Sequence, residues 1–258
     1  MSRIIAIANQ KGGVGKTTTA INLAAALATA ERKTLLIDTD PQSNATRGLG
    51  VAHQDERASL YDVLVNEVPA QEVLVPTELD YLMLLPADRD LIGAELELTT
   101  VEAREYRLRE AVRSLERDYE FIILDCPPAL GLLTVNALCA ARAVIVPVQC
   151  EYLALEGLTE LMETLKRVRE GFNPELALEG ILLTMFDERT NLARQVVNEV
   201  QAYFKENVFK VIVPRNIRLG EAPSFGKPII LYDIRSKGSE AYLSLAQEIM
   251  AHEKAGTW

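Results

Sequence analysis

Lysines, glycines and threonines are concentrated near the N-terminus, in a segment whose composition suits phosphate binding. Glycines allow an open turn in which backbone N–H groups converge on an anion. Lys16 is placed to reach the β- and γ-oxygens of a nucleoside triphosphate, and the Thr17 hydroxyl can ligate Mg²⁺. The segment therefore predicts a nucleotide phosphate cradle, with the candidate binding residues Lys11, Gly12, Gly13, Val14, Gly15, Lys16, Thr17 and Thr18.

This loop departs from the usual G-x-x-x-x-G-K-[ST] pattern, because Gln10 stands where the first glycine is expected. It also carries a second lysine, Lys11, directly before its first glycine. The flanks fit the mechanism, since residues 4–8 predict a buried strand and residues 17–30 a helix whose N-terminus faces the phosphates. We therefore interpret the segment as a phosphate-binding loop rather than a chance run of glycine and lysine.

Carboxylates follow two further apolar runs, each of which predicts a buried strand. The run from Thr34 to Asp38 leads into Asp40, and the run from Phe121 ends at Asp125, as in a Walker B strand. Carboxylates at the C-terminal end of a strand, beside a phosphate loop, are placed to hold Mg²⁺ or to position water. A strand that ends in aspartate is a weak signal alone, but it is a strong one together with the upstream loop.

Apolar runs alternate with helical segments along nearly the whole chain. This alternation predicts an α/β fold, a doubly wound and mostly parallel sheet flanked by helices. Because no repeat, low-complexity segment or linker interrupts it, residues 1–258 are interpreted as a single domain built around the P-loop. The segment 43–50, made of small residues, is expected to be a loop. Further strands are expected at 81–85, 143–148, 180–184 and 210–213, and further helices at 59–64, 91–98, 102–116, 156–170, 192–205 and 239–253.

The composition excludes several classes of protein. Hydrophobic residues make up 48% and charged residues 25%, as in a soluble globular protein. No apolar stretch approaches ~18 residues, so no transmembrane span is expected, and the N-terminal segment does not resemble a secretory signal. Cys126, Cys139 and Cys150 contain no C-x-x-C pair and are interpreted as buried, reduced thiols of a cytoplasmic protein.

The charge of the chain is unevenly distributed. A formal net charge of −10 by itself argues against a nucleic-acid partner. Residues 180–240, however, contain nine basic and seven acidic side chains, which gives +2 there and −12 for the rest. This asymmetry permits a basic face without proving one.

Two further motifs accompany the three phosphate-site segments. The full set is K-G-G-V-G-K-T-T-T, L-L-I-D-T-D-P-Q-S-N-A-T, I-I-L-D-C-P-P, P-V-Q-C-E-Y-L-A-L-E-G and V-P-R-N-I-R-L-G-E-A-P-S-F-G-K-P-I. Together these motifs resemble the ParA/Soj family of chromosome-partitioning ATPases, over about residues 4–246. The family belongs to the deviant-Walker P-loop class, which includes MinD and the nitrogenase iron protein.

The resemblance implies a role for each residue of the phosphate site. Lys11 matches a lysine that crosses a dimer interface to the partner's phosphates, and Gly12 matches an interface position too close for a side chain. Asp40 matches the residue that positions or activates the attacking water, whereas Asp38 has two interpretations, a carboxylate near the metal or a cap of its own loop. The implied catalytic residues are Lys11, Lys16 and Asp40, and the implied metal-binding residues are Thr17, Asp125 through water, and Asp40 as a further candidate.

The same resemblance implies a site for the adenine base. Met185, Pro214 and Asn216 follow strands at one edge of the expected sheet. They offer flat apolar contact and one amide that can bind the edge of the base. Met185 has the alternative interpretation of an ordinary core residue.

Arg189 and Arg218 match family positions that contact DNA. Their chemistry is charge on phosphate, so the expected binding is non-specific and weakens with salt. No aromatic residue adjoins either arginine in the sequence, which disfavours stacking on single strands. Ordinary surface arginines are the alternative interpretation.

Other P-loop proteins and a plain binding module were weighed against this interpretation. A MinD-type positioning ATPase at a membrane surface would carry a basic amphipathic tail, but residues 240–250 contain no lysine or arginine. An iron–sulfur reductase needs cluster ligands, and Cys126 has no evident second ligand. A metabolic P-loop ligase would not need the basic segment 189–218, and a module that merely holds nucleotide has no use for Asp40.

We therefore expect a switch ATPase of chromosome segregation with ATP and Mg²⁺ as cofactors. The expected cycle is an ATP-dependent homodimer that binds double-stranded DNA non-specifically. A ParB/Spo0J-type centromere-binding protein would stimulate a weak intrinsic hydrolysis and release it. The protein is expected in the cytoplasm, associated with the nucleoid and not with a membrane, and the MinD-type ATPase is the second hypothesis.

Overall fold

One sheet of eight strands forms the centre of the part of the chain that the computed structural model describes, residues 2–51, 57–151 and 154–255. The strand order is β3-β4-β2-β5-β1-β6-β7-β8, and every neighbouring pair is parallel except β3 with β4. The expected doubly wound, mostly parallel α/β fold is therefore confirmed. The strands are β1 (Arg3–Ile7), β2 (Thr34–Asp38), β3 (Val75–Pro76), β4 (Leu82–Leu85), β5 (Phe121–Asp125), β6 (Ala143–Gln149), β7 (Ala177–Phe186) and β8 (Val208–Pro214).

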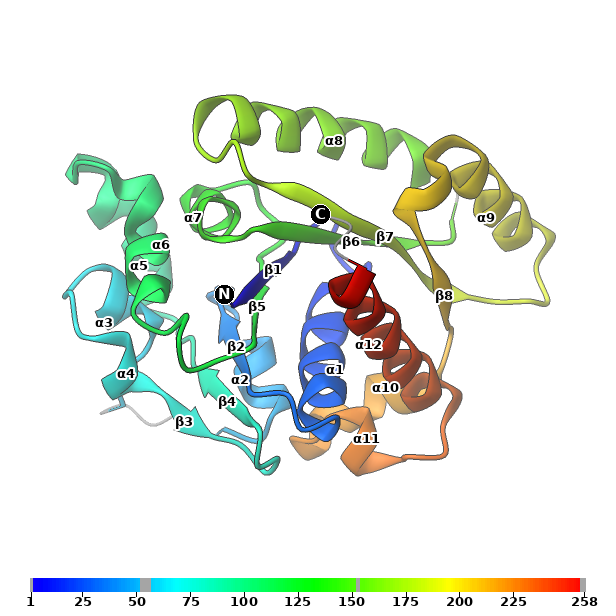
Figure 1. Cartoon of the computed structure of the whole chain (residues 1–258), viewed down its shortest axis with the longest axis horizontal. Helices are drawn as coiled ribbons and strands as arrows, with labels where there is room; N and C mark the ends of the chain where they lie inside the picture. Colours follow the sequence, from blue (N-terminus) through cyan, green and yellow to red (C-terminus); the bar gives the residue numbers. More distant parts are fainter. Residues whose placement is uncertain (1, 52–56, 152–153, 256–258) are drawn as a thin grey trace.

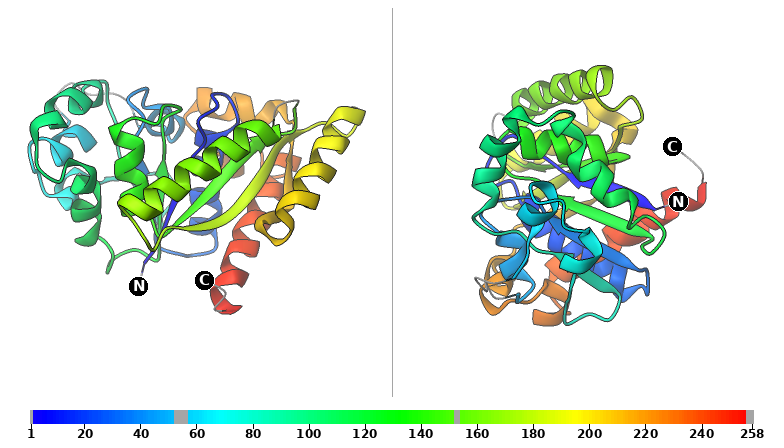
Figure 2. Two further views of the ribbon diagram at one scale, coloured as in Figure 1. Left: turned by 90° about the horizontal axis from the view of Figure 1, so that it is seen from above. Right: turned by 90° about the vertical axis from the view of Figure 1, so that its left-hand side faces the viewer.

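Helices cover both faces of this sheet (Figure 1). The right-hand view of Figure 2 shows the strands between α8 above and α1 with α11 below. One face carries α1 (Lys16–Thr29), α2 (Asn44–Gly48), α10 (Ile217–Glu221), α11 (Ile229–Tyr232) and α12 (Lys237–Ala255). The other face and the β4 end carry α3 (Leu60–Leu64), α4 (Ala70–Val73), α5 (Leu91–Glu97), α6 (Arg107–Arg113), α7 (Leu132–Ala140), α8 (Ala154–Gly171) and α9 (Asn191–Phe204).

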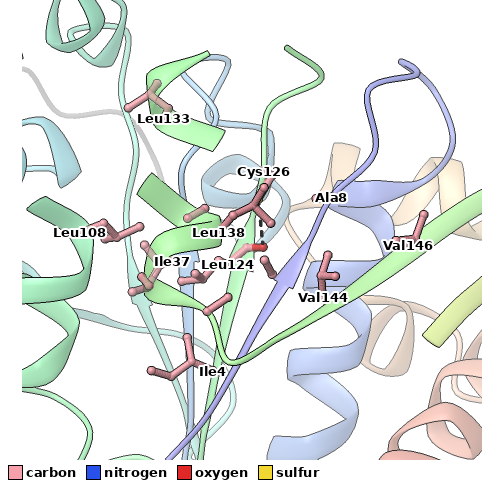
Figure 3. Close-up of a cluster of buried hydrophobic side chains, with 14 of the residues drawn as sticks. Ile4, Ala8, Ile37, Leu108, Leu124, Cys126, Leu133, Leu138, Val144 and Val146 are labelled. Atoms are coloured by element: carbon pink, nitrogen blue, oxygen red, sulfur yellow. Dashed lines mark hydrogen bonds between the residues drawn. The ribbon is translucent and has the colours of Figure 1, made fainter. Parts of the chain in front are cut away.

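Two hydrophobic cores follow from these two layers. On the α7 side, Leu133 and Leu138 face the strand residues Ile4, Leu124 and Val144 (Figure 3). On the opposite side α1 is buried along nearly its whole length, because the sheet covers one flank and α12 another. This sandwich fixes the N-terminus of α1, and hence the end of the preceding loop, against the sheet.

The strand order brings the predicted phosphate-site segments together. Strands β2, β5 and β1 are neighbours, and Asp38, Asp125 and Ile7 lie side by side in the register. The carboxyl ends of these three strands therefore meet at one edge of the sheet, where the loop after β1 also begins. This is the edge at which parallel α/β sheets bind their ligands.

Most of the expected elements are present, with several corrections. The segment 43–50 is not simply a loop, because it contains the short helix α2. Residues 102–116 form a 3₁₀ turn followed by α6 rather than one long helix. Helices α4, α7, α10 and α11 and the short strand β3 were not predicted. Positions 1, 52–56, 152, 153 and 256–258 of the predicted domain lie outside the described residues, and two of them, 152 and 153, fall in a quoted motif.

The three cysteines are buried and free of disulfides, as expected. Cys126 packs in the α7-side core, with its Sγ 3.9 Å from the Leu124 carbonyl oxygen (Figure 3). Burial raises the pKa of the Cys126 thiol and raises those of Cys139 and Cys150 to about 11. Among the described residues, no helix is both long enough and apolar enough to cross a bilayer.

Candidate nucleotide site

The loop between β1 and α1 has the conformation that a phosphate cradle requires. Gly13 and Gly15 adopt positive φ angles of 74° and 89°, which other residues rarely take. Gly15 is the N-cap of α1, so the first turn of a buried helix is directed at the loop. The free N–H groups and positive end of that helix favour a bound anion.

Polar contacts from two other strands fix this loop. The Asn9 amide donates to the Pro147 carbonyl oxygen at 2.7 Å and accepts the Lys11 N–H at 3.0 Å. The Thr184 hydroxyl donates to the Val14 carbonyl oxygen at 2.8 Å. Neither Asn9 nor Thr184 was predicted as a site residue, although each is a polar residue at the end of an apolar run, and that signal could have identified both.

The two lysines of the loop differ in their surroundings. Lys16 is 7% exposed, and its Nζ donates to the Lys11 carbonyl oxygen at 3.1 Å. Burial lowers the pKa of Lys16, and the nearby Asp125 carboxylate acts in the opposite direction. Lys11 is exposed, and its side chain forms no hydrogen bond or ion pair with the described residues. Lys16 is therefore a buried residue of the cradle, whereas the Lys11 side chain is exposed to solvent.

Asp38 caps the loop that carries Asp40. Its carboxylate accepts the Asp40 N–H at 3.1 Å, the Thr46 N–H at 2.8 Å and the Thr46 hydroxyl at 2.7 Å. Burial raises the pKa of Asp38 to about 6, while the bonds from Thr46 oppose that shift. These contacts favour the loop-capping interpretation of Asp38. Asp40 itself is 7% exposed and accepts the Gln42 N–H at 2.9 Å.

Asp125 is a buried carboxylate whose oxygens lack hydrogen-bond partners among the described residues. It is 0% exposed, and neither oxygen accepts a hydrogen bond of normal geometry within residues 2–51, 57–151 and 154–255. The Thr17 hydroxyl is nonetheless close enough to lower the pKa of Asp125. Burial and then Asp38 raise that pKa well above its usual range, against Thr17 and Lys16. A buried carboxylate in this condition is destabilising unless a cation or its water ligands satisfy it.

These residues fit a magnesium ion held together with a nucleotide. Mg²⁺ is usually bound through one or two protein oxygens, several waters and substrate phosphates. The Thr17 hydroxyl and the unsatisfied Asp125 oxygens supply such groups at the edge of the cradle. Within the described residues, no three His, Cys, Asp or Glu side chains are grouped to hold a metal ion without such help.

The predicted adenine-contacting residues line one pocket beside the loop. This cavity has a volume of about 190 Å³ and includes Met185, Pro214 and Asn216. Met185, near the end of β7, has a positive φ of 52° and is partly exposed. Because it lines the pocket, it is not an ordinary core residue. The Asn216 Oδ1 accepts the Arg218 N–H at 2.8 Å, which leaves its amide N–H₂ for a ligand. The remaining lining residues are Gly15, Thr18, Thr184, Val213, Arg215, Leu219, Gly220 and Tyr242.

The two predicted DNA-contacting arginines are exposed and paired with acidic side chains. The Arg189 side chain is 82% exposed and binds Asp187 through two hydrogen bonds of 2.8 and 2.7 Å. Arg218 in α10 pairs with Glu221 at 2.9 Å. Both are surface arginines on the segment with the local basic excess, as expected, but neither is a free cation.

Comparison with known proteins adds the family. A family model described as "AAA domain" matches residues 2–178. The chain is 61% identical over 253 residues to the chromosome partitioning protein ParA of Myxococcus xanthus, covering 98% of this chain and 89% of that one. It is 53% identical over 249 residues to the chromosome-partitioning ATPase Soj of Thermus thermophilus, covering 96% of each. The chain belongs to the ParA/Soj family of chromosome-partitioning ATPases.

Solved structures show the same fold with nucleotide. A cobyrinic acid a,c-diamide synthase from Mycobacterium smegmatis with bound ADP and magnesium is 39% identical, with a TM-score of 0.87 and coverage of 99% of this chain and 97% of that one. The septum site-determining protein MinD of Pyrococcus horikoshii, complexed with Mg-ADP, is 28% identical, with a TM-score of 0.79 and coverage of 98% and 99%. The predicted membership of the MinD-related P-loop class is therefore confirmed for this ParA/Soj family member.

Proposed function

We propose that this chain is a slow, Mg²⁺-dependent ATPase that acts as a switch in chromosome partitioning. One observation carries the proposal: the glycine loop, the base pocket and the unsatisfied Asp125 carboxylate converge at one sheet edge. Solved structures of this fold hold ADP with magnesium, or an ATP analogue with magnesium, and these ligands match the chemistry of each part.

Each group has a part in hydrolysis. Backbone N–H groups from Gly13 to Thr18 hold the phosphates, and Lys16 turns from the Lys11 carbonyl to the phosphate oxygens. Asp40 orients the attacking water, because a carboxylate at this position can accept a proton of that water. Thr17 and, through water, Asp125 would hold the magnesium ion, which would supply positive charge to the phosphate oxygens.

The switch requires a second copy of the chain. Lys11 would supply its positive charge to the phosphates of the partner subunit, and a cation supplied in this way raises phosphoryl-transfer rates by ~10³–10⁵. The ATP-bound homodimer would present two sets of Arg189 and Arg218 to duplex DNA, which makes binding bivalent and dependent on nucleotide. A ParB/Spo0J-type protein would stimulate hydrolysis and release the dimer, and the protein would associate with the nucleoid.

The test is dimerisation and duplex-DNA binding measured side by side without nucleotide, with ADP and with ATP. We expect both activities only with ATP, and both lost on hydrolysis. Arg189→Glu and Arg218→Glu should lose DNA binding and keep the ATP-dependent dimer. A protein that stays monomeric with a non-hydrolysable ATP analogue, or that ignores DNA in that state, would refute the proposed function.

A further inference from the structure

A second cavity, of about 330 Å³, lies next to the base pocket. The two cavities share Pro214 and Arg215. The second one is lined by three basic side chains, Arg189, Arg215 and Lys237, which come from the loop after β7, the end of β8 and the start of α12. Its other lining residues are Phe186, Asp187 and Glu188. Segments far apart in sequence therefore gather positive charge around one hollow.

Asp187 is the counter-ion of Arg189. Besides the two side-chain bonds from Arg189, it accepts the Arg189 backbone N–H at 3.1 Å. The hydrogen bonds from Arg189, and then the charges of Arg189 and Arg215, hold the pKa of Asp187 well below its usual range. The carboxylate occupies the position at which an anionic ligand of these arginines would bind.

All three cations are open to solvent. The side chain of Arg215 is 57% exposed, and its other ion pair, with Glu151, is long at 3.8 Å. Lys237 is exposed and forms no ion pair or side-chain hydrogen bond with the described part of the chain. Exposed ion pairs such as Arg189–Asp187 contribute little to stability, so a phosphate can replace the carboxylate at small cost.

The cavity includes one of the two arginines proposed to contact DNA. Arg189 lines it directly. Arg218 follows Arg215 by three residues, and its Nε is 3.7 Å from Asp233, which precedes Lys237 by four residues. Arg218 therefore lies beside the segment that leads into Lys237, whereas Arg189, Arg215 and Lys237 line the cavity itself.

We propose that a phosphodiester of duplex DNA binds in this cavity, contacts Arg215 and Lys237, and replaces Asp187 as the counter-ion of Arg189. This inference rests on the proposed function. It also links DNA binding to the base pocket through Arg215. This residue lies between Pro214 and Asn216 of that pocket, and its backbone N–H donates to the Phe186 carbonyl oxygen at 2.9 Å. One short segment therefore contacts both the nucleotide and the DNA.

The experiment measures duplex-DNA affinity against salt for the full chain with Mg²⁺ and a non-hydrolysable ATP analogue. The variants are Arg215→Gln, Lys237→Gln and Asp187→Asn, and the matched control is Lys210→Gln, an exposed lysine of β8 outside the cavity. Each lost phosphate contact lowers the slope of log K against log[salt] by about 0.9. A dimer carries each change twice, so Arg215→Gln and Lys237→Gln should each lower the slope by about 1.8.

Asp187→Asn should bind DNA more tightly than the unchanged protein, because asparagine keeps the acceptor for the Arg189 N–H and removes the competing charge. A misfolded variant cannot produce this gain. Analogue affinity is measured for each variant, and Lys237→Gln, which lies outside the base pocket, should leave it unchanged.

The inference would be overturned if Arg215→Gln and Lys237→Gln gave the same salt slope as Lys210→Gln, or if Asp187→Asn bound DNA more weakly than the unchanged protein. Arg189→Glu tests the proposed function separately. Vesicles of phosphatidylglycerol and phosphatidylcholine form a second arm. Retention on these vesicles without binding to DNA would also overturn the inference, in favour of a membrane surface.

Discussion

The carboxylate of Asp125 is expected to destabilise the nucleotide-free protein. It is fully buried, with both oxygens unsatisfied among the described residues. A buried charged group that lacks its partner costs about 1–3 kcal/mol or more. Asp125→Asn keeps the shape and removes the charge, so it should raise the free energy of unfolding without nucleotide by about 1–3 kcal/mol. For a chain of this size, that is roughly 2–12 °C in melting temperature.

The stability of the nucleotide-free protein is expected to depend on pH, and the direction of this dependence follows from the pKa shifts. Burial raises the pKa of Asp38 to about 6 and raises that of Asp125 well above its usual range. Between the ordinary carboxylate pKa of about 4 and these raised values, the folded state binds more protons than the unfolded state, so stability falls as pH rises. Asp125→Asn should remove the part of this fall that continues above pH 6.

The assay is thermal unfolding from pH 4 to pH 8, with and without Mg²⁺ and an ATP analogue. Asp118→Asn, an exposed carboxylate just before β5, is the control and should change stability by less than about 0.5 kcal/mol. A ligand at 100 times its Kd stabilises the unchanged protein by about 2.7 kcal/mol, and Asp125→Asn should gain less. If Asp125→Asn melts below the unchanged protein without ligand at every pH, the account of a strained metal-site carboxylate is wrong.

Three further variants test other parts of the site. Gly12→Val should fold and bind ATP but stay monomeric in sedimentation with an ATP analogue, because no atom lies within 4 Å of an added Cβ in the single chain; a normal dimer would contradict the close approach, and Gly157→Ala is the control at an equally open glycine. Asp40→Ala should keep ATP-dependent dimers and DNA binding but lose phosphate release, and unchanged turnover would remove Asp40 from the mechanism. Thr184→Val leaves the Val14 carbonyl without its 2.8 Å hydrogen bond, so calorimetry should show weaker nucleotide binding and about 1–3 kcal/mol less stability; unchanged values would show that the loop does not depend on it.

The sequence predicted the elements that are buried on both faces. Strands β2 and β5 are short apolar runs that end in aspartate, and a parallel central strand must be apolar throughout because helices cover both of its faces. The alternation of strands and helices predicted a parallel sheet. In the structure, Asp38 and Asp125 are paired at the ends of neighbouring strands of that sheet. The phosphate site could therefore be assembled from the chain alone.

The missed elements depend on contacts between distant residues. Helix α7 is apolar nearly all round, so it has no polar face to give a helical period. The short helix α2 begins at Asn44 and is held by Asp38, whose carboxylate accepts the Thr46 N–H and hydroxyl. The pairing of Arg189 with Asp187 is likewise a matter of loop geometry, which spacing does not reveal.

The fixed position of Lys11 is the strongest structural support for a two-subunit switch. Asn9 binds the Lys11 N–H, and the neighbouring Gln10 side chain donates to the Thr164 hydroxyl of α8 at 3.0 Å, so the backbone around Lys11 is held in place. Yet its exposed side chain bonds to nothing in the described part of the chain. Lys16 already serves the cradle from inside. A cation on a fixed backbone, exposed and unpaired among the described residues, is of use to a second molecule, and the open space over Gly12 leaves room for that molecule to approach.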